Sequence, residues 1–478
     1  MRLGQVGTAC LWLAAQAGAA ATNFSSRVDE ILSRPTFADA TVGVRVYDLE
    51  TGDIVYTRNE DSPLIPASNQ KLLTSTVALS KLGLDFIFDT AVLATCAVNR
   101  NGVLNGDLWL VGSGDPSLTS ERLADLARDL VARTGLKRIT GNVYGDGSVF
   151  DNKFLGEGWS EDDESFYYSA QVAGLNTDLN VVSVTVSPGP AEGSAATVKV
   201  NGVPADEELY VDIQSTIDTI AAGGQNSGVF ERLHGTNTII LGGSISADSG
   251  PITFQITIDN PNAFTAYRFA LALNRAGVQV PRSPTKPGKA PRKAVRLGTS
   301  KSEPLSSLLK LFMKPSDNMY GEALLKTVGR AEYPNQPGSS ASGVQVVKAF
   351  LEQEGIDSAG VSTVDGSGLS SLNTVTARFI TDLLVHNRKT FTGEEWNTYF
   401  DALPIGGVDG TLKDRFVGSP VVGHVRAKTG SLTGVSSLSG YLSAEDGKEY
   451  VFSILMNGFT STTEARKAQD DIVIALYS

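Results

Sequence analysis

Two β-hairpin patterns stand near opposite ends of the chain. The first joins an alternating apolar segment at residues 42–47 to residues 54–56, and the second joins residues 437–444 to residues 450–456. Alternating apolar and polar residues on both sides of a short Gly-containing turn are typical of a hairpin. A capping-box pattern then precedes an amphipathic segment at residues 465–476, which predicts a closing helix. The sequence therefore predicts one domain built from both ends of the chain, with the middle of the chain inserted into it.

The middle of the chain has a different character. Short β-rich runs separated by Gly, Asn, Asp and Ser fill much of the interval from about residue 87 to residue 260. We therefore predict a domain formed by residues 22–86 and 261–478, one or more β-rich domains inserted at residues 87–260, and a separate leader at residues 1–21.

Composition excludes several kinds of site. The 478 residues include 40 Lys and Arg against 52 Asp and Glu, so the formal net charge is −12, which argues against nucleic acid as a partner. Two cysteines cannot form a Cys-based metal cluster, and the three histidines contain no His-x-x-x-His pair. We expect no metal and no other cofactor. A serine triad using one of the histidines stays possible, but a base other than histidine is favoured.

The first residues resemble an export signal. Arg2 precedes an Ala-rich apolar stretch at residues 11–21, and Ala17-Gly18-Ala19 offers a small-x-small cleavage site. The stretch is too short for a transmembrane span, and no later run approaches the ~20 apolar residues that a span needs. The alternative is an Ala-rich helix of the mature domain. We expect a secreted or otherwise extracytoplasmic protein, in which Asn23 begins a glycosylation-type sequon.

The first chemical motif is Ser68-Asn69-Gln70-Lys71 at the predicted start of a helix. Positions i and i+3 lie on one helix face, so a hydroxyl and an amine would lie side by side. The amine can accept the hydroxyl proton if burial and a nearby cation lower its pKa. Backbone N–H groups at a helix start can also stabilise developing negative charge.

The second and third motifs are Ser316-Asp317-Asn318, before a predicted helix, and Lys428-Thr429-Gly430-Ser431, on a predicted strand. A hydroxyl and an amide on a loop can relay a proton and hold a substrate amide, although the same residues also suit a helix N-cap. In the third motif, an ammonium group and hydroxyl groups on an edge strand suit the binding of a substrate carboxylate. The alternative interpretation of this motif is a strand that simply ends in a turn.

The order of the three motifs indicates a specific chemistry. S-x-x-K, S-D-N and K-T-G occur in this order in penicillin-binding proteins and class A β-lactamases. Ser316 follows Ser68 by 248 positions, which is far more than the helical subdomain of a β-lactamase needs. The chain resembles the class C low-molecular-mass penicillin-binding proteins of the D-alanyl-D-alanine carboxypeptidase/endopeptidase (peptidase S13) family. The stretches at residues 112–116, 365–369 and 403–412 add to the resemblance.

The resemblance implies a fold class and a reaction. The fold would be α/β (α+β), with a serine β-lactamase/transpeptidase-like domain in which helices flank an antiparallel sheet, and with β-rich domains inserted between the first two motifs. Ser68 would be the acylated nucleophile, Lys71 its general base and Ser316 the donor of a proton to the leaving amine. The substrate would be a D-Ala-D-Ala peptide or a peptidoglycan stem peptide, with β-lactams as inhibitors.

The same resemblance assigns the substrate-binding groups. Asn318 would position the substrate amide, Lys428 and Thr429 would hold the terminal carboxylate, and the backbone N–H groups of Ser68 and Ser431 would form the oxyanion hole. Two alternatives stay open. One is a related serine hydrolase of D-amino-acid amides, esters or β-lactams, and the other is a cell-wall-binding protein without turnover.

One departure from the family concerns substrate preference. Family members commonly carry Arg after the Ser-Gly-Leu-Ser stretch, where it helps to bind a charged end of the peptidoglycan side chain, whereas this chain has Ser371. Three further features are weaker candidates for function: Asp115 is expected to be a turn former, His424 a structural residue, and the acidic run at residues 161–164 a solvated loop.

Overall fold

The computed structural model describes residues 24–202, 210–281 and 285–478. The predicted leader, Cys10 and Asn23 lie outside these residues. Two compact units divide the chain: one comprises Met1–Leu84, Ser306–Asp317 and Val344–Ser478, and the other comprises Asp85–Leu305 and Asn318–Gly343.

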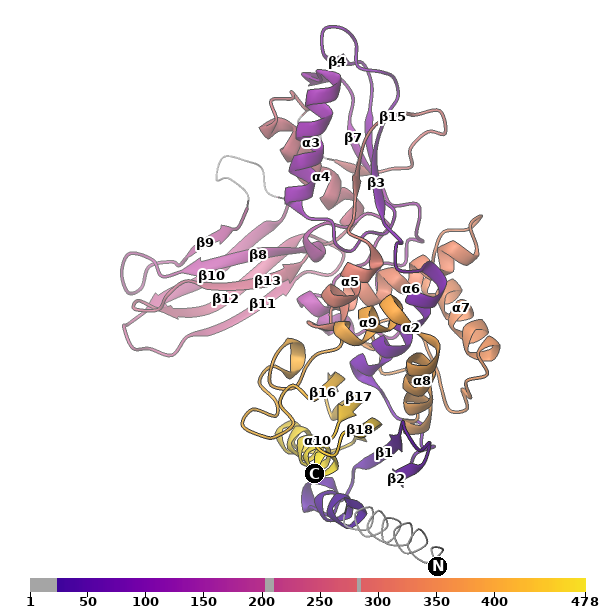
Figure 1. Ribbon diagram of the computed structural model, residues 1–478. Helices are drawn as coiled ribbons and strands as arrows, with labels where there is room; N and C mark the ends of the chain where they lie inside the picture. Colours follow the sequence, from indigo (N-terminus) through magenta and orange to yellow (C-terminus); the bar gives the residue numbers. More distant parts are fainter. Residues whose placement is uncertain (1–23, 203–209, 282–284) are drawn as a thin grey trace, which may run out of the picture. The chain divides into compact units, whose positions relative to one another are not determined.

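A five-stranded sheet forms the centre of the first unit, and both predicted hairpins are confirmed within it. All its neighbouring strands pair antiparallel. Its strands, in spatial order, are β16 (Val425–Leu432), β17 (Val435–Ser443), β18 (Glu449–Asn457), β1 (Thr41–Asp48) and β2 (Ile54–Arg58). Because β1 pairs with β18, the two ends of the chain share one sheet (Figure 1).

Helices cover both faces of this sheet, as the alternation along β1 requires. Val42, Val44 and Val46 pack in one core with residues of α10 (Thr462–Tyr477) and of a helix at residues 24–32. Arg45 points to the other face, where its guanidinium binds Asp382 of α8 (Ala377–Thr390) at 2.6 Å. The predicted antiparallel sheet flanked by helices is thereby confirmed.

The remaining elements of the first unit are mostly helical. They are η1 (Pro35–Phe37), η2 (Ala67–Asn69), α2 (Gln70–Leu82), α5 (Leu305–Met313) from Ser306 onward, α7 (Ser340–Gln353) from Val344 onward, α9 (Gly393–Ala402) and η6 (Gly410–Leu412).

Two groups of sheets make up the second unit. One sheet, in spatial order, contains β14 (Lys286–Pro287), β7 (Val143–Asp146), β5 (Leu108–Val111), β3 (Asp89–Ala94) and β15 (Val295–Lys301). It shares a core with α3 (Ser120–Thr134) and α4 (Pro261–Arg275), and β4 (Val103–Leu104) pairs with β6 (Arg138–Ile139).

The other group consists of two three-stranded sheets that share one apolar core. Their strands are β8 (Val181–Ser187), β9 (Thr197–Val200), β10 (Asp212–Ile220), β11 (Ser227–Arg232), β12 (Thr238–Ser246) and β13 (Ile252–Thr257). Short helices η3 (Glu161–Asp163), η4 (Tyr167–Ser169) and η5 (Asp178–Asn180) precede these strands, and α6 (Asn318–Glu332) completes the unit.

The division of the structure differs from the predicted one after residue 260. Residues 261–305 and 318–343 cluster with the second unit rather than with the sheet formed by the chain ends. The physical reason is the packing of α4, whose buried Phe269 and Leu273 belong to the core that α3 and β5 also build. A helical pattern in sequence does not reveal which sheet the apolar face of the helix will cover.

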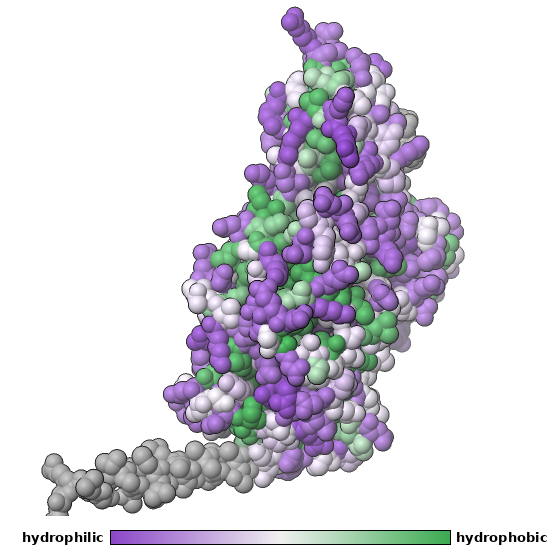
Figure 2. All heavy atoms as spheres, turned by 90° about the vertical axis from the view of Figure 1, so that its right-hand side faces the viewer, coloured by the Kyte–Doolittle hydropathy of each residue, from purple (hydrophilic) through white to green (hydrophobic). Residues whose placement is uncertain are grey.

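Polar and apolar residues are interspersed on the face of the molecule that Figure 2 shows. The large apolar side chains that are exposed come from different elements and loops, including Val229 of β11 and Val417 after η6. Within the described ranges, no helix combines the length and the apolar character that crossing a bilayer requires.

Candidate functional site

Ser68 and Lys71 lie side by side at a helix start. Ser68 is the middle residue of η2, and α2 follows directly at Gln70. Residues three apart on such a turn share a face, and the Nζ atom of Lys71 lies 2.9 Å from the Oγ atom of Ser68. Lys71 is fully buried and Ser68 is partly exposed. A hydroxyl open to solvent and a buried amine are thus within hydrogen-bond distance.

The sheet fixes this helix start through three contacts. The Ser437 hydroxyl donates to the Pro66 carbonyl at 2.6 Å, and the Asn69 amide donates to the Ser439 hydroxyl at 2.7 Å. Gly430 approaches the same turn so closely that a Cβ atom there would lie 2.6 Å from the Pro66 oxygen and 2.9 Å from the Ser68 nitrogen. The glycine of the third motif is therefore required for close backbone approach.

A second partner of Lys71 was not expected from the sequence. Its Nζ atom donates to the Ser367 carbonyl at 2.6 Å. The buried Asp365 carboxylate shapes this loop by accepting hydrogen bonds from the backbone N–H groups of Gly368 and Ser370 at 2.8 and 2.7 Å. Gly368 has a φ of 82°, and a Cβ atom there would lie 1.9 Å from the Ala67 oxygen. The stretch at residues 365–369 was the available signal, but the role of a carbonyl group could not be read from it.

Lys428 and Ser316 meet although they lie far apart in sequence. Lys428 is on β16, and its Nζ atom donates to the Ser316 Oγ atom at 2.8 Å and to the Thr429 carbonyl at 2.8 Å. Ser316 has a φ of 65°, a left-handed conformation that is uncommon for a residue other than glycine. The alternative interpretation of this motif, as a helix N-cap, does not account for the contact between the Ser316 hydroxyl and Lys428.

Two buried lysines give the site its electrostatic character. Burial lowers the pKa of Lys428 well below its ordinary value of 10.5, and repulsion from the Lys71 ammonium lowers it further. Because this repulsion is mutual, a proton on one lysine disfavours a proton on the other. Two amines under such repulsion suit a site that must accept a proton from a hydroxyl.

The other two residues of the third motif have different surroundings. The Thr429 hydroxyl donates to the Thr411 hydroxyl at 2.7 Å. Ser431 is exposed, and its Oγ atom accepts a hydrogen bond from Arg466 of α10 at 3.2 Å. Alternation along β16 explains the difference, because Lys428 and Gly430 share one face of the strand while Thr429 and Ser431 share the other.

Asn318 belongs to the second unit as the first residue of α6. Its side-chain amide donates to the Tyr168 carbonyl of η4 at 2.7 Å. Six of the seven predicted site residues thus lie in the first unit, where two hydroxyl–amine pairs are formed, and Asn318 follows Ser316 by two positions in the chain.

The weaker candidates have structural surroundings. The buried Asp115 accepts from the backbone and hydroxyl of Ser117 and pairs with Arg122 at 2.9 Å. His424 lies in the turn before β16, where its ring contacts the Tyr477 ring at a centroid distance of 5.2 Å. These contacts agree with the interpretation of Asp115 and His424 as structural residues.

The acidic run at residues 161–164 corrects one expectation. It was expected to be a solvated loop. Glu161 and Asp162 are exposed as expected, but the side chain of Glu164 is only 5% exposed and pairs with the buried Arg232. Burial of a carboxylate requires a cationic partner, and Arg232 is distant in sequence, so the run alone could not reveal the pair.

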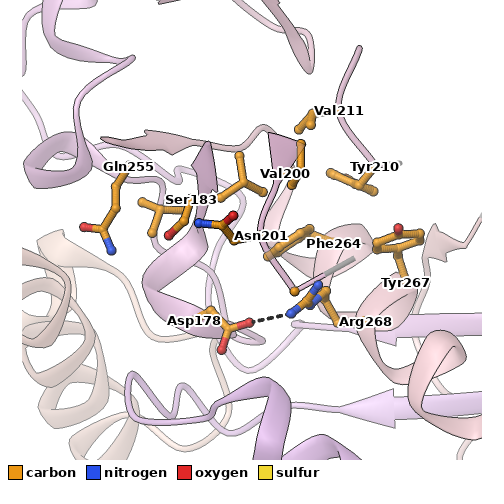
Figure 3. A pocket seen from close by; sticks show the side chains of 13 residues that line it. Asp178, Ser183, Val200, Asn201, Tyr210, Val211, Gln255, Phe264, Tyr267 and Arg268 are labelled. Carbon is orange, nitrogen blue, oxygen red and sulfur yellow. Dashed lines mark ion pairs between the residues drawn. The ribbon is translucent and has the colours of Figure 1, made fainter. Parts of the chain in front are cut away.

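A pocket of about 320 Å³ lies in the second unit (Figure 3). Its walls include Tyr210, Phe264 and Tyr267, and Arg268 pairs there with Asp178 at 3.4 Å. Among the described residues that line it, none belongs to the three motifs, so this pocket is separate from the Ser68–Lys71 pair.

Comparison with known proteins identifies a family. The model of the D-Ala-D-Ala carboxypeptidase 3 (S13) family matches residues 24–477. A D-alanyl-D-alanine carboxypeptidase from Actinomadura sp. (strain R39) is 37% identical over 97% of this chain and 86% of its own length. The D-alanyl-D-alanine carboxypeptidase DacB of Haemophilus influenzae is 30% identical over 90% of each chain.

Solved structures agree with this result. The crystal structure of penicillin-binding protein 4 (dacB) from Haemophilus influenzae has a TM-score of 0.83 and 27% identity, and the match covers 94% of this chain and 98% of that one. The same protein complexed with a β-lactam has a TM-score of 0.77 and 26% identity, over 95% and 99% of the two chains. The predicted family and fold class are confirmed.

Proposed function

Because the chain belongs to the D-Ala-D-Ala carboxypeptidase 3 (S13) family, we propose that it hydrolyses the terminal D-alanyl-D-alanine bond of peptidoglycan stem peptides through an acyl-enzyme on Ser68. The observation that carries the proposal is the 2.9 Å contact between the buried Lys71 amine and the partly exposed Ser68 hydroxyl. A serine with an adjacent base is the arrangement that nucleophilic catalysis needs, and this one requires neither histidine nor metal.

The acylation step uses both hydroxyl–amine pairs. Ser68 Oγ attacks the carbonyl carbon of the penultimate D-alanine while neutral Lys71 accepts the Ser68 proton. The backbone N–H groups of Ser68 and Ser431 stabilise the oxyanion. When the intermediate collapses, the C–N bond breaks, and Ser316, hydrogen-bonded to Lys428, passes a proton to the departing amine. The proton that Lys71 accepted replaces the one that Ser316 gave, so both side chains return to their starting states.

Hydrolysis completes the cycle. Neutral Lys71, within hydrogen-bond distance of Ser68 Oγ, accepts a proton from a water molecule that attacks the Ser68 ester. When the C–O bond breaks, Lys71 gives this proton to Ser68 Oγ, and the shortened peptide loses its remaining proton to solvent and leaves as its carboxylate. One base therefore serves both half-reactions.

Substrate binding uses the remaining motif residues. The ammonium group of Lys428 and the hydroxyl group of Thr429 hold the terminal carboxylate, and the Asn318 amide holds the peptide amide. A β-lactam carries a carboxylate and a strained amide, so attack by Ser68 opens its ring and leaves a stable ester. The solved complex of the Haemophilus influenzae relative with a β-lactam supports this extension.

Location and side-chain preference belong to the same proposal. The signal-like pattern at residues 1–21 supports export, which would place the enzyme with its peptidoglycan substrate. Ser371 is exposed and lacks the cationic group that the family commonly has there, so we expect weak preference for side chains that end in a charged group. D-alanine release from matched peptides with and without a diaminopimelate side chain tests that preference.

Labelling with a fluorescent penicillin, followed by mass mapping of the adduct, tests the function. The expected result is one adduct on Ser68, no labelling of Ser68→Ala, and wild-type labelling of Ser80→Ala, which removes an exposed hydroxyl from α2, the helix that follows Ser68. An adduct on another residue, or undiminished labelling of Ser68→Ala, would contradict the mechanism. D-alanine release from a D-Ala-D-Ala peptide separates a peptidase from a protein that only binds.

A further inference from the structure

Residues 160–169 form a strap, here meaning the segment that leads from Ser160 through η3 to the end of η4. Its far end contacts α6, where the Tyr168 carbonyl accepts the hydrogen bond from the Asn318 amide at 2.7 Å. Just beyond it, Ala170 and Val172 share a small apolar core with Met319 of α6. The strap therefore has a polar contact with the start of α6, and the residues that follow the strap have an apolar one.

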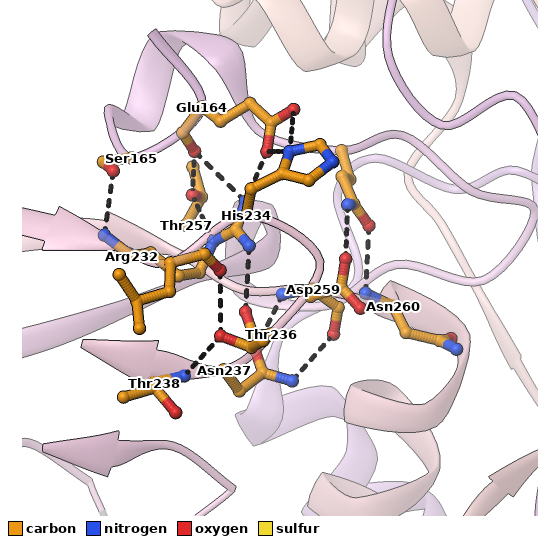
Figure 4. Close-up of polar contacts among 12 residues, drawn as sticks. Glu164, Ser165, Arg232, His234, Thr236, Asn237, Thr238, Thr257, Asp259 and Asn260 are labelled. Atoms are coloured by element: carbon orange, nitrogen blue, oxygen red, sulfur yellow. Dashed lines mark hydrogen bonds and ion pairs between the residues drawn. The ribbon is translucent and has the colours of Figure 1, made fainter. Parts of the chain in front are cut away.

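The near part of the strap is anchored by Glu164. Its carboxylate pairs with the fully buried Arg232 guanidinium of β11 at 3.4 Å, and its carbonyl accepts from the Thr257 hydroxyl of β13 (Figure 4). Thr257 Oγ1 also accepts from Arg232 Nε at 3.1 Å. The Nδ1 atom of His234 lies 3.1 Å from both carboxylate oxygens of Glu164. Arg232 of β11, His234 of the turn that follows β11, and Thr257 of β13 thus all contact Glu164.

The segment between Glu164 and the contact with α6 is held in place by several contacts. The Ser165 carbonyl accepts from the Thr257 N–H group at 3.3 Å, and the Ser165 hydroxyl accepts from the Arg232 N–H group at 2.9 Å. The Phe166 ring stacks on the Tyr168 ring at 5.5 Å and meets Phe230 edge-on at 5.4 Å. A shift at Glu164 is therefore transmitted along a short, ordered segment to the Tyr168 carbonyl.

We propose that Glu164 and Arg232 are positioning residues, which set the orientation of the Asn318 amide through the strap. The terminal torsion of an asparagine side chain is broad, so hydrogen-bond partners decide where its oxygen and nitrogen point. This inference rests on the proposed function, in which the Asn318 amide holds the substrate. It gives the inserted β-rich sheets a catalytic purpose, because a residue of β11 controls a group of the second motif.

A double-mutant cycle on acylation tests the proposal. Glu164→Gln should lower the rate constant of penicillin acylation by roughly tenfold, since small misplacements of binding groups cost that much or more. In the Asn318→Ala background, Glu164→Gln should cause no further loss. Thr257→Val, which keeps side-chain volume and leaves the ion pair in place, should give a smaller loss in the same direction. It serves as the second variant if Glu164→Gln does not fold.

The matched control is Arg122→Gln, which breaks another ion pair with a buried carboxylate in the same unit, that of Asp115. Acylation of this control should proceed at the wild-type rate per folded molecule, with folded protein counted by circular dichroism. Unchanged acylation in Glu164→Gln, or an equal loss with and without Asn318, would overturn the inference. Lack of acylation in the wild type would instead contradict the proposed function, so the two failures are distinguishable.

Discussion

The Nζ atom of Lys428 donates a hydrogen bond to the Ser316 Oγ atom at 2.8 Å, across 112 positions of sequence. Ser68 and Lys71 form the corresponding pair across three positions. The first pair depends on tertiary packing and the second on one turn of helix. Both Nζ groups are buried, and repulsion between their charged forms links the two pairs.

Replacement of Lys71 by methionine should abolish acylation. Methionine keeps the volume of the buried stem but cannot accept the Ser68 proton, and loss of a general base typically costs about 100-fold or more. Stopped-flow measurement of penicillin acylation gives the rate. Lys81→Met, at the exposed end of the same helix, is the control and should acylate normally. Acylation of Lys71→Met within a few-fold of wild type would exclude Lys71 as the base.

Gly430→Ala should impair acylation by about 100-fold, because an added Cβ atom would meet the Pro66 oxygen at 2.6 Å and the Ser68 nitrogen at 2.9 Å. We also expect a loss of about 1–3 kcal/mol in the free energy of unfolding, which is typical of overpacking. Gly250→Ala is the control, since a Cβ atom there would have no neighbour within 4 Å. Normal acylation by Gly430→Ala would show that this close approach is not required.

Lys428→Met should change how stability depends on pH. The buried Lys428 has a pKa well below 10.5, whereas in the unfolded chain it has the ordinary value. Between these two pKa values the unfolded state binds more protons, so this residue makes the wild type more stable as the pH rises toward 10.5. At pH values below the lowered pKa of Lys428, the folded protein carries the buried charge, and the full cost of burying it reduces the free energy of unfolding. The methionine variant lacks this dependence.

Urea unfolding at several pH values measures this effect. The stability difference, wild type minus Lys428→Met, should increase with pH by at most about 1.4 kcal/mol per pH unit. Lys467→Met removes an exposed ammonium group from α10 and should give a curve parallel to that of the wild type. A difference that is constant with pH would contradict the burial of a charged Lys428.

Tyr56→Phe should have the opposite pH behaviour. The Tyr56 hydroxyl donates to Asp29 at 2.6 Å, and burial, followed by this hydrogen bond, raises the pKa of Tyr56 from 10.0 to about 12. A raised pKa means that the stabilisation is fully present below pH 10 and is lost as the pH rises toward 12. The free energy of unfolding of the wild type should therefore exceed that of the variant by about 1 kcal/mol at neutral pH.

That advantage should shrink above pH 10. Chemical denaturation from pH 7 to 11 measures it, and Tyr333→Phe, which removes the hydroxyl of an exposed ring, is the control with little expected effect. An advantage that grows above pH 10 would contradict the assigned hydrogen bond.

Local patterns predicted the elements correctly where the cause was local. The hairpins of β1–β2 and β17–β18 follow from alternation around short turns, and α10 begins after the Ser461 cap as its capping box indicates. The Ser68–Lys71 contact was also predictable, because helical geometry alone places residues i and i+3 on one face.

The sequence by itself determined the three motifs, their order, and the pairing of a hydroxyl with an amine at a helix start. Only the tertiary structure decided that Lys428 reaches Ser316, that the Ser367 carbonyl accepts from Lys71, and that Glu164 is buried against Arg232. It also decided that α4 packs in the second unit. Each of these contacts joins segments that lie far apart in the chain and forms because their surfaces are buried against each other, away from water. Such contacts leave no periodic pattern in the sequence.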